Sequence, residues 1–468
     1  MKTIIQSILS LLILVSVTQS CGPQKKNDEK QKEVKESTKS DLPWLKSAVL
    51  YEVDLIQYTA SGNFKGFSGR LDSLKMLGVD VLMFMPLQPI GIKNNTGIHG
   101  RYYAIQDHKS INAKFGTSDD FRILVEKCHE KGFKVIIDWE ANYTSRDNKL
   151  LTDHPDWYSA DSAVKLVSPI ANSGDEIAVA KLNYEKNEVN DYMIGAMKWW
   201  VDEFEVDGFR CHMANGIPTV FWEMASEQLN QTKKVLMLAH AEQADHMEKA
   251  FHACYGFKFN EIMKGIYKGT KNADSLINYL VYTAKNFPAD AAKVYYTAYH
   301  DQYAYFGTSK ELFGELEEQA IALSFTINGI PLVYNGSEVG NDKRLTAMNT
   351  DAINWNTANA KTRLEFYKTL ISIRHKNPSI WTNVDAQTNT RLFKQHKNVY
   401  AFIRQSGENK VLVVANMSGK TVQMDSQEIP GLEKMELRLY KNMKTDGVHL
   451  YELGPWGYSV STINENTD

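Results

Sequence analysis

A repeated order of apolar strand, amphipathic helix and glycine constrains the fold of this chain more than any other feature. From Ala48 onward, short apolar runs alternate with longer segments whose apolar residues recur three or four positions apart. The short runs predict strands buried on both faces, and the longer segments predict helices packed against them. The predicted strands are residues 49–56, 79–85, 133–139, 209–211, 235–239, 255–259, 294–299 and 330–334. An α/β chain with this pattern is expected to close into a (β/α)8 TIM barrel.

An open, doubly wound sheet would show the same alternation and is the structural alternative. The sequence contains neither G-x-G-x-x-G nor G-x-x-x-x-G-K-[ST], the motifs that would support a nucleotide-binding sheet of that kind. The closed barrel is therefore the favoured architecture.

Two segments depart from the alternation. Residues 143–184 are long and rich in turn-forming residues, which predicts a short subdomain inserted after the third strand of the barrel. After Lys376 the helical pattern stops and short alternating runs begin, which predicts an antiparallel β-domain. We expect the barrel to span residues 42–380 and the C-terminal β-domain to span residues 381–468.

The N-terminal residues are expected to serve targeting instead of the fold. Lys2 precedes an apolar run from Ile4 to Val17, and Cys21 follows it in a pattern that resembles the lipobox of bacterial lipoproteins. This predicts a signal peptide over residues 1–20, lipidation of Cys21, and attachment to the cell envelope through the lipid alone. Residues 21–41 are mostly charged or polar and predict a disordered tether. A secretory signal with a chance cysteine is the alternative.

Charge and cysteine content narrow the classes of partner. Lys and Arg total 53 and Asp and Glu total 56, so no strong net field favours nucleic acid, and none is expected as a partner. The cysteines beyond the signal, Cys128, Cys211 and Cys254, are odd in number and predict no disulfide framework. Each is expected to pack as a small hydrophobic residue.

The main candidate site follows the predicted strand 209–211. Arg210 and His212 emerge where this strand ends, and the C-terminal ends of barrel strands are where such folds hold their active sites.

Further motifs follow one another along the chain. They are Tyr103 to Asp107 with Ile111-Asn112 and Phe115 to Thr117, then Asp138 to Asn142, Gly208 to His212, Leu238 to His240, Tyr299 to Asp301, and Pro331 to Glu338. Their order resembles the α-amylase superfamily, glycoside hydrolase family 13, from Leu42 to the C-terminus. The resemblance implies a barrel that acts on α-glucan or malto-oligosaccharide.

The resemblance also assigns the catalytic positions, and here the chain departs from the family. Retaining glycosidases use two carboxyl groups about 5 Å apart, one as nucleophile and one as acid. The nucleophile position is His212 and the acid/base position is His240, whereas the position that stabilises the transition state keeps its carboxylate as Asp301. Glu140 and Glu242 lie nearby in sequence but are expected to fall off the catalytic positions.

Further positions follow from the same resemblance. The implied substrate-binding residues are Tyr103, Asp138, Arg210 and His300, together with Tyr143 and Tyr299, which stand where the family has His and Asn. Asn142 matches one ligand of the family's calcium ion, but Lys181 stands where another ligand belongs, which argues against that ion.

These departures leave three functional hypotheses. The first is an α-glucan-binding homologue with lost or much reduced hydrolase activity, because an imidazole offers no anionic oxygen to stabilise the developing sugar cation. The second is an active α-glycosidase or α-amylase of carbohydrate metabolism in which His240 donates the proton. The third is a metal-binding barrel with new chemistry at His212, His240, His300 and Asp301.

The loss of an anion at His212 also leaves the family's arginine without its partner. A buried guanidinium needs a replacement anion, and Asp301 is the nearest candidate in the motif set. We therefore expect Arg210 to pair with Asp301.

Overall fold

The computed structural model describes residues 41–92, 102–159, 164–167, 176–344, 352–382 and 387–463. The predicted signal peptide, Cys21 and all but the last residue of the tether lie outside the described residues. Among the described residues, no helix combines the length and the apolar character needed to cross a membrane.

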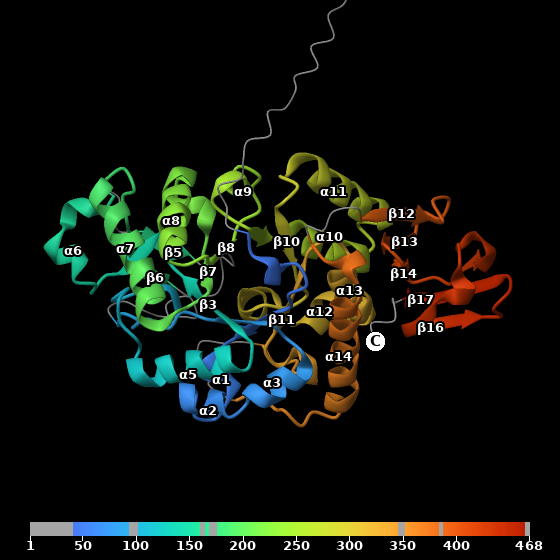
Figure 1. Ribbon diagram of the computed structural model, residues 1–468, viewed down its shortest axis with the longest axis horizontal. Helices are drawn as coiled ribbons and strands as arrows, with labels where there is room; N and C mark the ends of the chain where they lie inside the picture. Colours follow the sequence, from blue (N-terminus) through green and yellow to red (C-terminus); the bar gives the residue numbers. More distant parts are fainter. Residues whose placement is uncertain are drawn as a thin grey trace, which may run out of the picture. The chain divides into compact units, whose positions relative to one another are not determined.

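Eight parallel strands close into a barrel, which confirms the predicted fold class (Figure 1). Around the barrel the order is β1-β11-β10-β9-β8-β7-β3-β2. The strands are β1 (Leu50–Val53), β2 (Val81–Phe84), β3 (Lys134–Trp139), β7 (Gly208–Cys211), β8 (Leu236–Ala239), β9 (Ala253–Tyr255), β10 (Ala292–Tyr295) and β11 (Ile330–Tyr334). Their side chains are almost all buried, as expected for strands covered on both faces.

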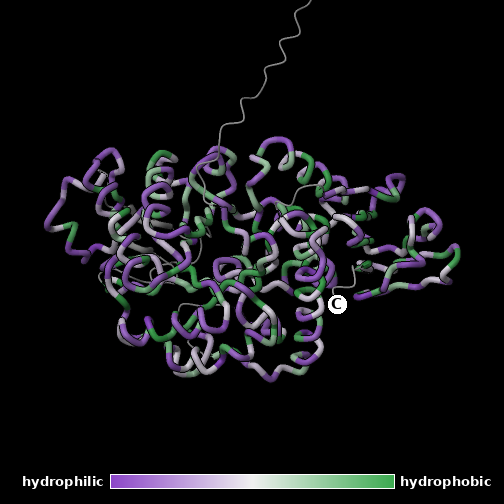
Figure 2. Tube along the Cα trace, in the orientation of Figure 1, coloured by the Kyte–Doolittle hydropathy of each residue, from purple (hydrophilic) through white to green (hydrophobic). Residues whose placement is uncertain are grey.

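Helices of the barrel domain pack around these strands, and their apolar faces form the main core. The α-helices are α1 (Leu55–Tyr58), α2 (Phe64–Ser68), α3 (Leu71–Leu77), α5 (Ser118–Glu130), α7 (Asn187–Phe204), α8 (Thr219–Thr232), α9 (His246–Lys249), α10 (Phe257–Tyr267), α11 (Ala273–Asn286), α12 (Ser309–Phe313), α13 (Glu317–Thr326) and α14 (Ala360–Lys376). Figure 2 shows hydrophobic residues along the inner strands and hydrophilic residues on the outer turns.

The entry into β7 depends on a glycine. Glu205 ends α7 with a positive φ of 54°, and Gly208 begins β7 with a φ of 158°. A Cβ at Gly208 would lie 2.3 Å from the carbonyl oxygen of Leu236 on β8. Only glycine therefore lets the two strands approach closely enough to align Arg210 with its neighbours.

Several predicted strand limits are wrong, although the strands themselves are present. The predicted strand 255–259 ends at Tyr255, because Phe257 already begins α10. The predicted strand 294–299 is β10, which ends at Tyr295, and the first predicted strand stops before Leu55, where α1 begins. In each case the apolar run continues past the strand into the next buried turn or helix, so apolar content alone does not mark the strand end.

The segment after β3 forms the predicted insertion. It contains a three-stranded antiparallel sheet in the order β4-β6-β5, made of β4 (Tyr143–Ser145), β5 (Val164–Val167) and β6 (Glu176–Lys181). A short helix, α6 (Leu150–Asp153), lies between β4 and β5 in sequence.

The C-terminal part of the chain is an antiparallel sheet in the order β12-β13-β14-β17-β15, with β16 also paired to β17. The strands are β12 (Thr388–Leu392), β13 (Val399–Ser406), β14 (Asn409–Asn416), β15 (Val422–Asp425), β16 (Glu436–Thr445) and β17 (Leu450–Ile463). Gln319 of α13 donates to the carbonyl oxygens of Asn416 and Gly457, each across 3.0 Å, and so ties this sheet to the barrel domain.

Candidate active site

The register of three adjacent strands places the candidate catalytic positions side by side. Arg210 of β7 is paired with Asp138 of β3 on one side and with Leu238 of β8 on the other. The ladder continues past the strand ends, because His212 N donates to the carbonyl oxygen of Trp139 (2.8 Å) and His240 N donates to that of Cys211 (3.0 Å). His212 and His240 therefore leave neighbouring strands at the C-terminal end of the barrel, as the sequence predicted.

Three rings form a column at this end. The rings of Tyr103 and His212 are stacked with centroids 3.7 Å apart and an angle of 16° between their planes. The ring of His240 continues the column, with its centroid 5.2 Å from that of His212 and an interplanar angle of 18°. All three side chains are buried or nearly so, which fixes the direction in which each ring nitrogen points.

Arg210 makes polar contacts with three side chains of the site. Its Nη1 atom donates to Asp138 Oδ2 (2.7 Å), to the Tyr103 hydroxyl (3.1 Å) and to His212 Nδ1 (3.0 Å). The expected pairing of Arg210 with Asp301 is wrong. Asp138 takes that place because β3 and β7 hold the two residues in direct register.

The contact with Arg210 determines which ring nitrogen of His212 carries the proton. A guanidinium stays protonated and only donates, so His212 Nδ1 must accept and the proton of the neutral ring lies on Nε2. His240 is oriented in the same way, because its Nδ1 accepts from the backbone N–H of Met213 across 3.4 Å. The Nε2 atom of His212 lies 3.8 Å from Glu140 Oε2, and that of His240 lies 3.9 Å from Asp301 Oδ2.

His300 is held as a cation by the groups around it. The Tyr103 hydroxyl donates to Asp138 (2.7 Å), so it accepts from His300 Nε2 (2.7 Å), which also lies 3.2 Å from Asp301 Oδ1. Glu52 contacts His300 Nδ1 and accepts from the backbone N–H of the same residue. Burial lowers the pKa of His300, but Asp301 and Glu52 outweigh that effect and raise it to about 10.

Glu140 lies beside the site, although it was expected to fall off the catalytic positions. Burial raises the pKa of its carboxyl to about 8, although it accepts from the backbone N–H groups of Asn142 and Tyr143. Its position directly after β3 is the signal that could have identified it. Glu242 lies 3.2 Å from Lys293 Nζ and accepts from the Tyr279 hydroxyl.

Tyr143 and Tyr299, which stand where the family has His and Asn, lie in different parts of the structure. Tyr299 is 8% exposed and packs against the rings of Tyr296, Tyr255 and His240. Tyr143 is half-buried at the start of β4 and pairs with Lys181 of β6.

Of the two residues at the family's calcium position, Lys181 does not suit a calcium ion, and the buried side-chain oxygen of Asn142 alone would not hold one. Calcium needs oxygen ligands that face the ion. Here the side-chain nitrogen of Asn142 donates to the carbonyl oxygens of His212 and Met213, each across 3.2 Å. Lys181, at the other position, carries an ammonium group.

His212, His240 and Asp301 could in principle hold a transition metal. One ligand atom from each lies within 4.8 Å of the others. His300 is not part of this group, because its nitrogens face Glu52, Tyr103 and Asp301. Metal-bound imidazoles normally donate their second N–H to an acceptor. The second nitrogens of His212 and His240 instead accept, which disfavours metal binding through Nε2.

Comparison with known proteins identifies the family. The model described as alpha amylase, catalytic domain, matches residues 25–163 and 174–388, and that of the maltogenic amylase C-terminal domain matches residues 390–460. The first of these covers well over half of the chain. The protein therefore belongs to the α-amylase family.

Individual relatives agree with this assignment. The chain is 24% identical over 382 residues to Alpha-amylase 2 of Dictyoglomus thermophilum, which covers 77% of the chain and 64% of that protein. It is 26% identical over 380 residues to a cyclomaltodextrinase of a Bacillus species, covering 76% of the chain and 65% of the relative. The chain thus spans just under two thirds of the length of these relatives.

Solved structures show the same fold. An α-amylase from Lactobacillus plantarum has a TM-score of 0.74 at 23% identity, covering 90% of this chain and 99% of that one. An α-amylase from Geobacillus thermoleovorans, complexed with acarbose, has a TM-score of 0.72 at 19% identity, with coverage of 90% and 99%.

Proposed function

We propose that this protein binds α-glucan or malto-oligosaccharide at the C-terminal end of its barrel and does not hydrolyse it by the retaining mechanism of its family. The contact between Arg210 Nη1 and His212 Nδ1 carries this proposal. Because that contact uses the lone pair of Nδ1, the other ring nitrogen bears the proton and can only donate. The residue at the nucleophile position therefore offers no lone pair to an anomeric carbon.

The second hypothesis, an active α-glycosidase, requires a nucleophile to attack the anomeric carbon, and His212 does not provide one. His240 could supply a proton, and Glu140, whose pKa is raised by burial to about 8, would also be protonated at neutral pH. Neither group replaces the nucleophile. Asp301 keeps its carboxylate but lies against the cationic His300. Loss of a nucleophile costs on the order of a millionfold in other covalent enzymes.

Binding of sugar remains compatible with the site. Sugar hydroxyl groups both donate and accept, so they can meet imidazole N–H groups as well as carboxylates. Tyr103, Arg210, His300 and Asp301 occupy the family's sugar-contacting positions. Several relatives are named for their action on such glucans, including the cyclomaltodextrinase and a maltogenic α-amylase of Bacillus acidopullulyticus.

Titration calorimetry with maltohexaose tests the binding. We expect saturable heat at millimolar ligand or below, and loss of that heat in Asp301→Ala. Asp425→Ala, at an exposed position of the C-terminal sheet, serves as the matched control and should bind like the parent. No heat and no change in tryptophan fluorescence in the parent would contradict the proposal.

We also propose that the protein is anchored in the cell envelope by a lipid on Cys21. The motif around Cys21 and the polar tether behind it support this localisation. Fractionation of cells that produce the parent and Cys21→Ser tests it. The parent should be found with membranes and the variant in the soluble fraction, and a parent that stays soluble would contradict the anchor.

A further inference from the structure

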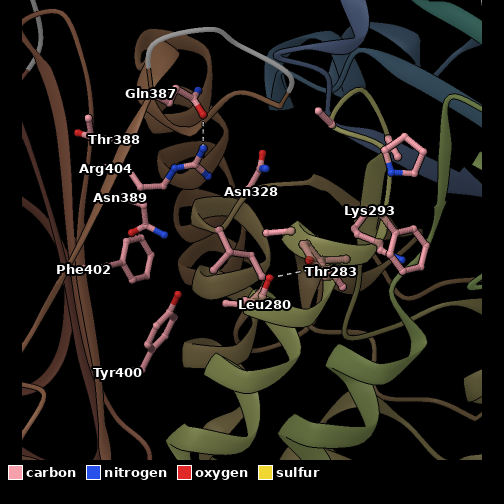
Figure 3. A pocket seen from close by; sticks show the side chains of 17 residues that line it. Leu280, Thr283, Lys293, Asn328, Gln387, Thr388, Asn389, Tyr400, Phe402 and Arg404 are labelled. Carbon is pink, nitrogen blue, oxygen red and sulfur yellow. Dashed lines mark hydrogen bonds between the residues drawn. The ribbon is translucent and has the colours of Figure 1, made fainter. Parts of the chain in front are cut away.

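A cavity lies between the barrel domain and the C-terminal sheet, and none of the three rings of the column lines it. Its volume is about 330 Å³, and it is bounded by α11, β10, β12 and β13. Figure 3 shows Tyr400 and Phe402 on the strand side and Leu280 and Thr283 on a helix opposite them. Volumes of this size suit small ligands.

A buried arginine reaches this cavity. Arg404 is 4% exposed, and one of its terminal nitrogens, Nη2, donates to Gln387, as the dashed line in Figure 3 marks. The other terminal nitrogen, Nη1, is buried and has no hydrogen-bond acceptor among the described residues. A buried charge without an anionic partner is costly, so Arg404 is suited to an anion that enters the cavity.

The described lining of the cavity carries no negative charge to balance Arg404. None of the described residues that line the cavity is acidic, and Lys293 lies in its wall. Lys293 forms an ion pair with Glu242 across 3.2 Å, and Glu242 does not line the cavity. Burial lowers the pKa of Arg404 to about 10, and its charge lowers that of Arg374 nearby, which agrees with a guanidinium that lacks a carboxylate.

The remaining lining supplies flat surfaces and amide groups. Tyr400 and Phe402 are buried side chains of β13, and Phe287, at the C-terminal end of α11, also lines the cavity. The rim carries the exposed side chains of Asn328 and Asn389. Aromatic walls with a few convergent polar groups are typical of sites for small organic ligands.

We propose that this cavity binds a small oxyanion, a carboxylate or a phosphate, through Arg404. The site is separate from the ring column and independent of whether that column binds glucan. A flat or ring-shaped body attached to the anion would lie against the aromatic side chains of the lining, Phe287, Tyr400 and Phe402.

Ligand-detected NMR with benzoate and with inorganic phosphate tests the proposal on the whole protein. Benzoate combines a carboxylate with a flat ring, and benzamide serves as its uncharged counterpart. We expect saturable binding of benzoate, of phosphate, or of both, at millimolar concentration, and at least tenfold weaker binding of benzamide.

Variants locate the binding. Arg404→Met should abolish it, whereas Arg391→Met should retain it, since Arg391 also lies near the Tyr400 ring but does not line the cavity. Ala284→Trp fills the rim from an exposed position of α11 without changing charge, and it should also abolish binding even if Arg404→Met folds poorly. Absence of binding by both anions to the parent, or unchanged binding in Arg404→Met or Ala284→Trp, would overturn the proposal.

Discussion

Arg210 Nη1 donates to His212 Nδ1 across 3.0 Å, and this one contact fixes the chemistry that His212 can perform. In a retaining site the same arginine would face a carboxylate nucleophile, as the resemblance to the family implies. Here the guanidinium forms an ion pair with Asp138, 2.7 Å away on the adjacent strand. The imidazole is left as a neutral acceptor toward Arg210 and as a donor at Nε2, which lies 3.8 Å from Glu140 Oε2.

The Asp138–Arg210 pair should be essential to the stability of the barrel. Asp138→Asn leaves a buried guanidinium without a charged partner, which costs about 3–5 kcal/mol in the free energy of unfolding. Urea denaturation of parent and variant measures this cost. The matched control is Asp119→Asn, which removes an exposed carboxylate that pairs with Arg122 and should leave stability nearly unchanged. Equal losses in the two variants would contradict the role given to Asp138.

His300 should make stability depend on pH above neutrality. Its folded pKa of about 10 lies above the ordinary histidine value of 6.5, so the folded state holds the proton more tightly than the unfolded state. The stabilisation is fully present below pH 6.5 and is lost as pH rises toward 10. The difference in unfolding free energy between parent and His300→Gln should therefore shrink over this range. A difference that stays constant from pH 6 to 10 would rule out a cationic His300.

Restoring both carboxylates should restore little activity. In the double variant His212→Asp, His240→Glu, Arg210 would meet a carboxylate again, and we expect the protein to fold as well as the parent. Tyr143 and Tyr299 still stand where the family has sugar-contacting His and Asn, so hydrolysis of maltohexaose should remain slow. Circular dichroism checks the fold and sugar release checks the activity. Recovery of rapid hydrolysis would show that the two histidines alone separate this chain from an active enzyme.

The purified protein should contain no stoichiometric transition metal at the ring column. His212 and His240 both accept at Nδ1, so neither ring can donate an N–H to a supporting acceptor while Nε2 binds a metal. Elemental analysis of protein purified without chelators, and again after incubation with Zn²⁺ and dialysis, measures this. One metal per chain that disappears in the double variant, together with a fall of several degrees in Tm, would support the metal hypothesis instead.

The fold could be predicted from the sequence because its signal is local. Alternating apolar strands and amphipathic helices predict a parallel sheet covered by helices, and the absence of nucleotide-binding motifs favoured the barrel over the open sheet. The motifs placed His212 and His240 at neighbouring strand ends. The end of the strand at Tyr255 could not be predicted, because the apolar run continues into α10 and a buried helix start looks like a buried strand.

The contacts of the site were less predictable because they depend on register. Asp138 and Arg210 are far apart in sequence, and only the pairing of β3 with β7 shows that they meet. The same is true of Glu52 and His300 and of the Arg404 cavity, whose walls come from two parts of the chain. The motifs suggested Asp301 as the partner of Arg210 because a motif gives no information on which residues of neighbouring strands meet.

The most direct test of the account follows binding and cleavage of one substrate in one sample. Maltohexaose at a saturating concentration would be incubated with the protein for many hours, and its length then analysed by chromatography, with calorimetry reporting occupancy. We expect bound and fully intact maltohexaose. Shorter products that appear with the parent but not with His212→Ala would contradict the account, because they would show that an imidazole held by Arg210 still supports hydrolysis.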